Sequence, residues 1–360
     1  MSNKSLKRSG LLMICLFSIS MASYSQFKDV DFLRSAPADG AKYIKAYLSP
    51  LANAFGSGLN GGWYNTAKPH KFGGFDITTN FSVGMVPTSA ETFNVNKIGL
   101  SSALTATGTG IASTAAGPKT STTQMSINDP SGATLASFST PKGSGFKFIP
   151  VPMAQVGLGL PLGTELKFRF IPKISIGDGN ISLWGVGLVH SLVQYLPGSK
   201  MLPFDVSLFG GYTKLQSNIP LNLQPDLSVA QNYNSPYTST FSNQNLNFNV
   251  SALNISLIAS LNLPVITLYG GLGYCKTQTE IKIQGDFPTP VLVTTPPVHV
   301  EYNNSGVKKG SDFPNIDMKN FSGLRANIGL RIKLSVITIH ADYTKAQYNV
   351  YSAGLGISFR

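Results

Sequence analysis

Ionisable side chains lie an even number of positions apart in each of three segments, a spacing that would place them on one face of a β-strand. The set consists of Glu165, Lys167, Arg169, Arg325, Arg331, Lys333, His340 and Asp342. His340 and Asp342 would share a face, and a serine in contact with such a pair could perform acyl transfer. No nucleophile motif accompanies them, so we expect no catalytic residues and no enzyme activity.

The basic members of this set outnumber the acidic ones. If the shared face lines an aqueous lumen, the excess of positive charge would favour anionic solutes. The alternative, which we favour, is an internal network of ion pairs and hydrogen bonds that fills a narrow interior. Either arrangement requires strands that close around a polar lumen.

The segment 75–85 is the clearest candidate for such a strand. Phe, Ile, Phe, Val and Met alternate with polar or small residues over eleven positions. That length suits a tilted strand that crosses a bilayer, whereas strands of soluble proteins are usually nearer 5–6 residues. Similar alternation appears at 165–170, 204–208, 266–275, 324–334 and 337–344, and further candidates are 150–160, 181–196 and 244–262.

The connections between these strands fall into two length classes. Short ones lie at 161–163, 263–264 and 335–336, whereas 88–145, 217–243 and 284–319 are long and rich in Ser, Thr, Asn, Pro and Gly. Short turns at one end and long loops at the other are typical of outer-membrane barrels. We therefore predict an all-β fold, an antiparallel transmembrane β-barrel of 10–14 strands over 71–360.

The composition agrees with this fold class. Charged residues make up 12% of the chain, against about 25% in ordinary soluble domains, and there are 36 glycines. The net charge of +12 is dispersed along the chain, which argues against nucleic-acid binding.

Residues 1–25 have the pattern of a secretory signal peptide, with a basic start, an apolar stretch at 10–22 and small residues before position 26. Its removal would leave Cys275 as the single cysteine, so no intrachain disulfide is expected. No Cys/His cluster of the metal-binding type is present, and we expect neither metal nor cofactor.

Residues 26–70 do not alternate. Residues 38–47 fit a short amphipathic helix, and Ser49 with Pro50 could start a second one. A glycine-dense stretch follows at 54–65. We expect this segment to plug the lumen or cap its periplasmic mouth or, alternatively, to lie as a periplasmic arm. The glycines at 270, 271 and 273 suggest either a bend in their strand or close packing against this segment.

His70, beside Lys68 and Lys71, is expected in a solvated turn, with contact to an anionic lipid headgroup as the alternative. Trp184 and many tyrosines and phenylalanines are expected to face lipid or to form interface girdles.

The last strand, 351–360, carries alternating apolar residues and a penultimate aromatic, Phe359. Terminal strands of this kind are recognised by barrel-assembly machinery, so that machinery and outer-membrane lipids are the expected partners. Together with the leader, the strand predicts the outer membrane of a Gram-negative bacterium.

Several stretches resemble an uncharacterised family of Bacteroidota outer-membrane barrels. They are 62–76, 150–153, 163–166, 184–187 with His190, and 348–359. The resemblance covers nearly all of the mature chain and implies a fold but no activity. More distantly, a helical segment before a long-stranded barrel is similar to the FadL-type transporters of hydrophobic compounds.

Two functional hypotheses follow. In the first, the barrel passes or binds a small hydrophobic or anionic molecule, with the N-terminal segment as gate. In the second, it is a non-transporting structural or accessory subunit of an outer-membrane assembly. A continuous lumen or a lateral opening between strands would favour the first, and a filled lumen with a large flat apolar patch beyond the lipid band would favour the second.

Overall fold

The computed structural model describes residues 37–359 except 121–122, 129–131, 177, 197–202, 226–240, 242, 290, 294 and 296–298. The predicted signal peptide therefore lies outside the described residues. None of the described helices is both long enough and apolar enough to cross a membrane.

Ten antiparallel strands close into a barrel, which confirms the predicted fold class at the lower limit of the predicted strand number. In spatial order they are β1 (Phe75–Met85), β19 (Val350–Phe359), β18 (Ile337–Lys345), β17 (Ile316–Leu334), β12 (Ile266–Gln284), β11 (Asn245–Asn262), β10 (Phe204–Pro220), β9 (Gly179–Ser191), β8 (Thr164–Ile176) and β7 (Phe148–Leu160). The barrel closes because β1 pairs with both β7 and β19, the last strand.

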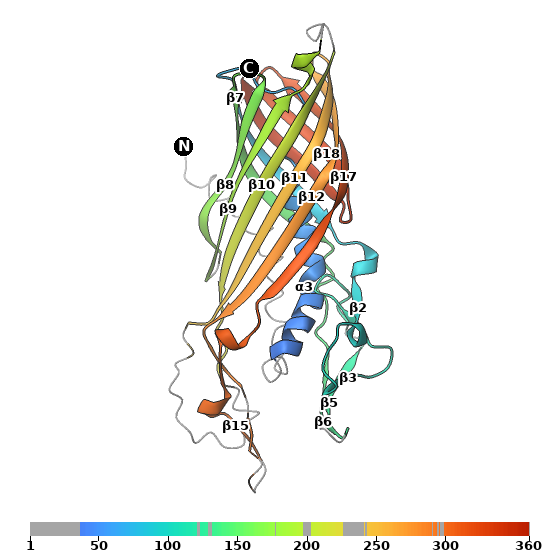
Figure 1. Ribbon diagram of the computed structural model, residues 1–360, viewed down its shortest axis with the longest axis vertical. Coiled ribbons are helices and arrows are strands. Elements are labelled where there is room, and N and C mark those ends of the chain that lie inside the picture. The colour runs from blue at the N-terminus through green and yellow to red at the C-terminus, as the bar shows by residue number, and fades with distance from the viewer. Residues whose placement is uncertain are drawn as a thin grey trace, which may run out of the picture.

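The two ends of the barrel differ. At the short-turn end, close connections join β7 to β8, β11 to β12 and β17 to β18, and the C-terminus lies there (Figure 1). At the long-loop end lie the connections 86–147, 221–244 and 285–315. The connection between β8 and β9 and the turn at 346–349 are also at this end although they are short.

In its described residues, the loop 86–147 contains five short strands, none of which joins the barrel. They are β2 (Thr92–Asn94), β3 (Leu104–Ala106), β4 (Ile111–Ser113), β5 (Gln124–Asn128) and β6 (Thr134–Ser139), and they pair only among themselves. The loop 285–315 likewise carries two separate pairs, β13 (Asp286–Pro288) with β16 (Val307–Lys309) and β14 (Val291–Val293) with β15 (His299–Glu301). Short 3₁₀ turns lie at Thr88–Ala90, Val95–Lys97, Val193–Tyr195, Asn304–Gly306 and Gly310–Asp312.

Four neighbouring strands, β10, β11, β12 and β17, are 17 to 19 residues long and extend beyond the rest at the long-loop end (Figure 1). The predicted loops 217–243 and 284–319 were therefore too wide, because strand residues occupy their margins. On these extensions the outward side chains become polar, as at Lys214, Gln216 and Asn218, so the apolar alternation fades before the strand ends.

The barrel's outer surface is apolar over its middle, with exposed side chains such as Leu257, Leu272, Leu324 and Leu355. Aromatic pairs border this region. Near the short-turn end the ring centroids of Phe75 and Phe359 are 5.0 Å apart. Toward the long-loop end lie two further pairs, Trp184 with Tyr212 at 5.7 Å and Tyr343 with Tyr351 at 5.0 Å.

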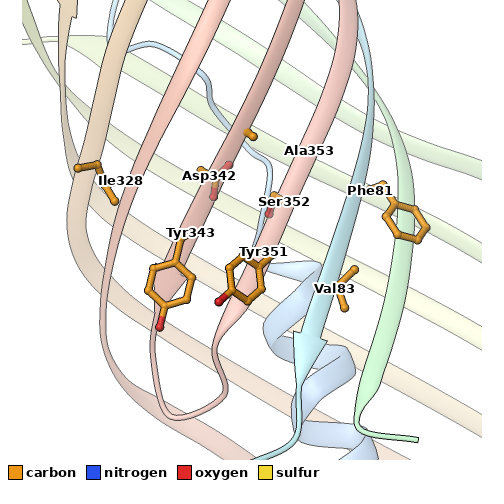
Figure 2. Close-up of a pocket in the computed structure, with 9 residues that line it drawn as sticks. Phe81, Val83, Ile328, Asp342, Tyr343, Tyr351, Ser352 and Ala353 are labelled. Carbon is orange, nitrogen blue, oxygen red and sulfur yellow. The ribbon is translucent and has the colours of Figure 1, made fainter.

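A hollow of about 410 Å³ interrupts the apolar surface where β1, β17, β18 and β19 are neighbours. Ala341 and Ala353 form its floor, and Figure 2 shows Tyr343 and Tyr351 side by side at one edge and Phe81 and Val83 at the other. The small alanines create the hollow because their larger neighbours stand above them.

Helix α3 (Pro37–Leu59) enters the barrel from the long-loop end and lies along its axis (Figure 1). The sequence predicted two helices divided near Pro50, and this was wrong. The ring of Pro50 removes one backbone donor within a single helix, while Ser49 Oγ donates to the Lys45 carbonyl at 2.5 Å. Burial on several sides keeps the helix continuous through the proline.

The outer half of α3 lies beyond the apolar region of the barrel. Tyr43 and Tyr47 are buried there against loop residues that include Val95, Leu104 and Met125. On its other side Ala52 packs with Ile281, Ile316 and Met318 of the extended strands. The loop 86–147 and the strand extensions thus enclose the helix between them.

Candidate functional site

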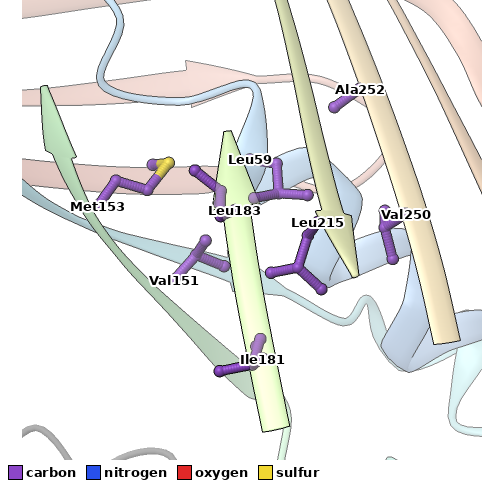
Figure 3. Close-up of a cluster of buried hydrophobic side chains, with 8 residues drawn as sticks. All are labelled: Leu59, Val151, Met153, Ile181, Leu183, Leu215, Val250 and Ala252. Atoms are coloured by element: carbon purple, nitrogen blue, oxygen red, sulfur yellow. The ribbon is translucent and has the colours of Figure 1, made fainter. Parts of the chain in front are cut away.

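The inner half of α3 is embedded in an apolar part of the lumen. Leu59 is fully buried in a cluster that Figure 3 shows, together with Val151, Met153, Ile181, Leu183, Leu215, Val250 and Ala252. These residues come from the inward faces of β7, β9, β10 and β11. The inner wall of the barrel at this level is therefore suited to pack against a helix and not to line a water-filled channel.

Beyond Leu59, Arg169 holds the turn that ends the helix. Its guanidinium donates to the carbonyl of Leu59 at 2.8 Å and to that of Gly61 at 2.7 Å. Its Cζ atom lies 3.6 Å from the ring centroid of Trp63, a cation–π contact. Arg169 is 1% exposed, and each of its donors to a backbone carbonyl is charge-assisted.

Gln155 supports the same turn from β7. Its Oε1 accepts from Arg169 Nε at 3.0 Å, and its Nε2 donates to the Trp63 carbonyl at 3.1 Å. Arg169 and Gln155 thus satisfy the carbonyls of Leu59, Gly61 and Trp63, at the end of the helix and in the irregular segment that follows it.

On the opposite side of the lumen, Arg325 donates to the Asn60 carbonyl at 2.7 Å and to Thr344 Oγ1 at 3.2 Å. Tyr64 donates to Asn327 Oδ1 at 2.7 Å. The predicted close packing of the β12 glycines is found at Gly271, where an added Cβ would lie 2.6 Å from the Tyr64 hydroxyl.

A buried ionic cluster lies near the short-turn end. His70 reaches Glu165 Oε2 through both its backbone N–H and its Nδ1, each at 2.9 Å. The ammonium of Lys167 pairs with the other oxygen of Glu165 and lies 3.9 Å from Asp76 Oδ1. All four side chains are less than 10% exposed.

His70 was expected in a solvated turn or at a lipid headgroup, and both expectations were wrong. The histidine is 4% exposed and faces the lumen. The backbone turns inward after Ala67, whose N–H donates to Ser260 Oγ at 3.0 Å and whose carbonyl accepts from Ser207. Neighbouring lysines in the sequence suggested a surface, whereas Glu165, the buried acid that accepts from the His70 backbone, lies 95 positions away in the sequence.

This cluster has the elements of two reactive arrangements. Ser358 Oγ lies 3.2 Å from His70 Nε2, so Ser358, His70 and Glu165 are in the order of a serine–histidine–acid triad. Ser358 is 2% exposed, however, and no substrate carbonyl can reach its oxygen in this conformation.

Ligand atoms of His70, Asp76 and Glu165 also lie within 4.8 Å of one another, close enough to hold a metal ion. The ammonium of Lys167 already supplies the positive charge between the two carboxylates. The cluster is therefore complete as an ionic network, and it joins the N-terminal segment to β1 and β8.

His340 and Asp342 have other partners than the serine that catalysis would need. His340 Nε2 lies 2.8 Å from Asn80 Oδ1, and its Nδ1 lies 3.4 Å from Asn65 Nδ2. Asp342 Oδ2 accepts from Tyr269 at 3.2 Å. Of the remaining sequence candidates, Arg331 is buried and Lys333 is half-buried toward the short-turn end.

The structure thus brings five of the eight candidates into direct contact with the N-terminal segment or with the ionic cluster around it: Glu165, Lys167, Arg169, Arg325 and His340. Sequence reasoning did not identify their counterparts Asn60, Trp63, Tyr64 and His70. The glycine-dense stretch around Trp63 was the available signal, because close approach to another segment is one of the reasons for such glycines.

Comparison with solved structures finds barrels of bacterial surface proteins at low similarity. The translocator domain of the autotransporter NalP from Neisseria meningitidis is 10% identical, with 86% of this chain and 93% of that chain covered and a TM-score of 0.28. The attachment invasion locus protein Ail of Yersinia pestis is 8% identical, with 80% and 98% covered and a TM-score of 0.25. The toluene transporter TbuX of Ralstonia pickettii is 9% identical, with 80% and 90% covered and a TM-score of 0.22.

No curated protein sequence matches the chain. A family model matches residues 4–359, nearly the whole sequence. The closed barrel, its ten strands and this match together place the chain: it belongs to the family of unknown function DUF6588, with an outer-membrane-type β-barrel fold.

Proposed function

We propose that this protein spans the outer membrane of a Gram-negative bacterium as a closed barrel, and that it is a structural or accessory component and not an open channel. The observation that carries the proposal is the filled lumen. Helix α3 and residues 60–74 occupy it, and apolar wall residues bury the inner half of the helix. The proposal assigns no catalytic role.

The outer surface supports the membrane placement. Apolar side chains cover the middle of the barrel, and aromatic pairs border them at both levels, as in outer-membrane barrels. By the same rule the short-turn end faces the periplasm and the long-loop end faces the exterior. The surrounding lipids and the barrel-assembly machinery, which would recognise the last strand, are the partners in this proposal.

Energetics support a lumen that stays closed. If α3 left, side chains such as Ile181, Leu183, Leu215 and Val250 would face water. Each costs about 1.5–3 kcal/mol when exposed. Arg169 and Arg325 would also lose their carbonyl partners, although water would replace these in part. A gate that opens this lumen would therefore have to offset a cost on the order of 10 kcal/mol.

Conductance in planar bilayers tests the proposal. The full chain should insert, show heat-modifiable gel migration and give no steady ohmic current. Deletion of residues 37–70 should remove the heat-modifiable band, because the apolar lumen wall loses its partner. A stable, conducting barrel from the deletion, or a steady current from the full chain, would restore the passage hypothesis.

A second candidate is the binding of a small hydrophobic molecule from the membrane, and the hollow in Figure 2 favours it. Replacement of both Ala341 and Ala353 by leucine would fill the hollow without touching the lumen. If native mass spectrometry finds a hydrophobic ligand retained by the original protein, the double variant should lose it. If both proteins retain the ligand equally, its binding site lies elsewhere on the protein.

A further inference from the structure

A second hollow, of about 350 Å³, lies on the outer face of the strand extensions at the long-loop end. Its lining is polar: Lys173, Asn180, Ser182, Gln216, Ser217, Asn218, Asn247, Asn249 and Lys282. All but Ser217, which is buried, have partly or fully exposed side chains. The amides form a row across β9, β10 and β11, since Asn218 is paired with both Asn180 and Asn247.

We propose that this hollow binds the phosphorylated sugar headgroup of a glycolipid in the outer leaflet. The inference rests on the membrane placement proposed above. The chemistry of the site itself comes from its lysines and amides.

The position of the hollow along the barrel axis indicates which region of the membrane it faces. On β10 the outward residues change from Leu208 and Tyr212 to Lys214, Gln216 and Asn218. Aromatic side chains mark the interface of the hydrocarbon region, and two residues along a strand advance by about 6.6 Å. The hollow therefore begins within one or two such steps beyond the aromatic level, where headgroups lie.

The positive charge of this face is available for a ligand. In the part of the chain that the structure describes, Lys173, Lys214 and Lys276 have no carboxylate within ion-pair distance, while Lys282 pairs with Glu280 at 2.9 Å. All four side chains point outward. Lys214 follows Tyr212 by two residues on β10 and pairs in register with Trp184, Lys276 follows Tyr274 by two residues on β12, and Lys173 and Lys282 lie farther toward the long-loop end. Ammonium groups at this position would contact phosphate groups.

The amides supply the sugar-binding component. Asn218 Nδ2 donates to Asn247 Oδ1 at 2.7 Å, and Asn247 Nδ2 donates to Gln284 Oε1 at 2.8 Å. These bonds orient the row on continuous strand ladders and leave further donors and acceptors facing outward. A phosphodiester lipid would use the lysines but few of the amides, whereas a phosphorylated sugar would use both.

Nanodiscs of phosphatidylcholine that contain lipid A, phosphatidylglycerol or neither as the probe test the proposal on the full chain. Native mass spectrometry should detect retained lipid A. The variant Lys173→Gln/Lys214→Gln should bind it about tenfold more weakly, because two exposed charge contacts of up to about 1 kcal/mol each are lost. Asn218→Leu/Asn247→Leu should weaken the binding of lipid A without weakening the binding of phosphatidylglycerol.

Lys345→Gln is the matched control, since Lys345 points outward just beyond Tyr343 on β18, away from the hollow. It should bind lipid A like the original chain. Equal binding by the lysine variant and the original chain would overturn the proposal, as would equal losses of lipid A and phosphatidylglycerol in the asparagine variant. Heat-modifiable migration and conductance, measured on the same samples, report separately on the closed barrel.

Discussion

Asp39 joins the first turn of α3 to the loop 86–147. Its carboxylate accepts from the Ser101 backbone at 3.1 Å and from Ser101 Oγ at 2.5 Å, and Lys42 Nζ lies 3.3 Å away. Burial raises the pKa of Asp39, but the hydrogen bonds from Ser101 and the charge of Lys42 outweigh it and lower the pKa below its ordinary value.

We expect this contact to weaken in acid. Because the folded-state pKa is lowered, the stabilisation is present above the unfolded value of about 3.9 and is lost as the pH falls through the folded-state value. Asp39→Asn should destabilise the contact between α3 and the loop by about 1–2 kcal/mol at neutral pH. Hydrogen exchange of residues 99–104 at pH 7 and pH 3 measures both effects.

Asp39→Asn is also the control, because its loop should show less change between the two pH values than that of the original chain. If the two proteins change equally, other carboxylates are responsible.

Alternation alone was enough to place Glu165, Lys167, Arg169 and Arg325 on an inward face. It could not supply their partners, because residues 60–74 have no repeating pattern and make side-chain hydrogen bonds to strand residues 92 to 288 positions away. His70 shows the difference: its sequence neighbours are lysines, but its structural neighbours are Glu165 and Ser358.

At the scale of elements, α3 and β1 approach so closely that a glycine is required between them. A Cβ added to Gly84 would lie 1.9 Å from the Ala54 carbonyl oxygen of the helix. Gly84→Ala should therefore displace α3 and destabilise the protein by about 2 kcal/mol or more. The temperature at which the folded gel band disappears measures the change.

Gly210→Ala on β10 is the matched control, since its added Cβ meets no atom within 4 Å. It should leave that temperature almost unchanged. Equal behaviour of the two variants would mean that α3 is not packed against β1.

The strands could be predicted from sequence wherever one face meets apolar surroundings and the other a polar lumen. The prediction failed at the outer ends of β10, β12 and β17. There the outward side chains are polar, and inward side chains such as Ile281 and Ile316 pack against α3. The prediction also divided α3 into two helices at Pro50. Local helix propensity takes no account of tertiary packing, and here tertiary packing buries the helix both at Tyr47 and at Ala52.

At the scale of the whole molecule, the direction of α3 gives the chain a defined polarity. Lys45 lies exposed on the outer half of the helix, whereas Lys71 lies exposed before β1 at the short-turn end. In intact cells, a membrane-impermeant maleimide should label Lys45→Cys and not Lys71→Cys. After lysis both should react, and the buried Cys275 should contribute little.

Labelling of Lys71→Cys alone in intact cells would reverse the proposed orientation. Labelling of neither, with both reactive after lysis, would contradict placement of the long-loop end outside the cell.

The junction between the first and last strands has a consequence for biogenesis. Residues 60–74 run directly into β1, and β1 forms the final ladder with β19, where Phe75 pairs with Phe359. The loop 86–147 covers the outer half of α3. Unless the N-terminal segment is threaded through a closed barrel, α3 must dock in the lumen before β1 pairs with β19. Docking of α3 would therefore determine when the barrel closes, which is the last step of insertion.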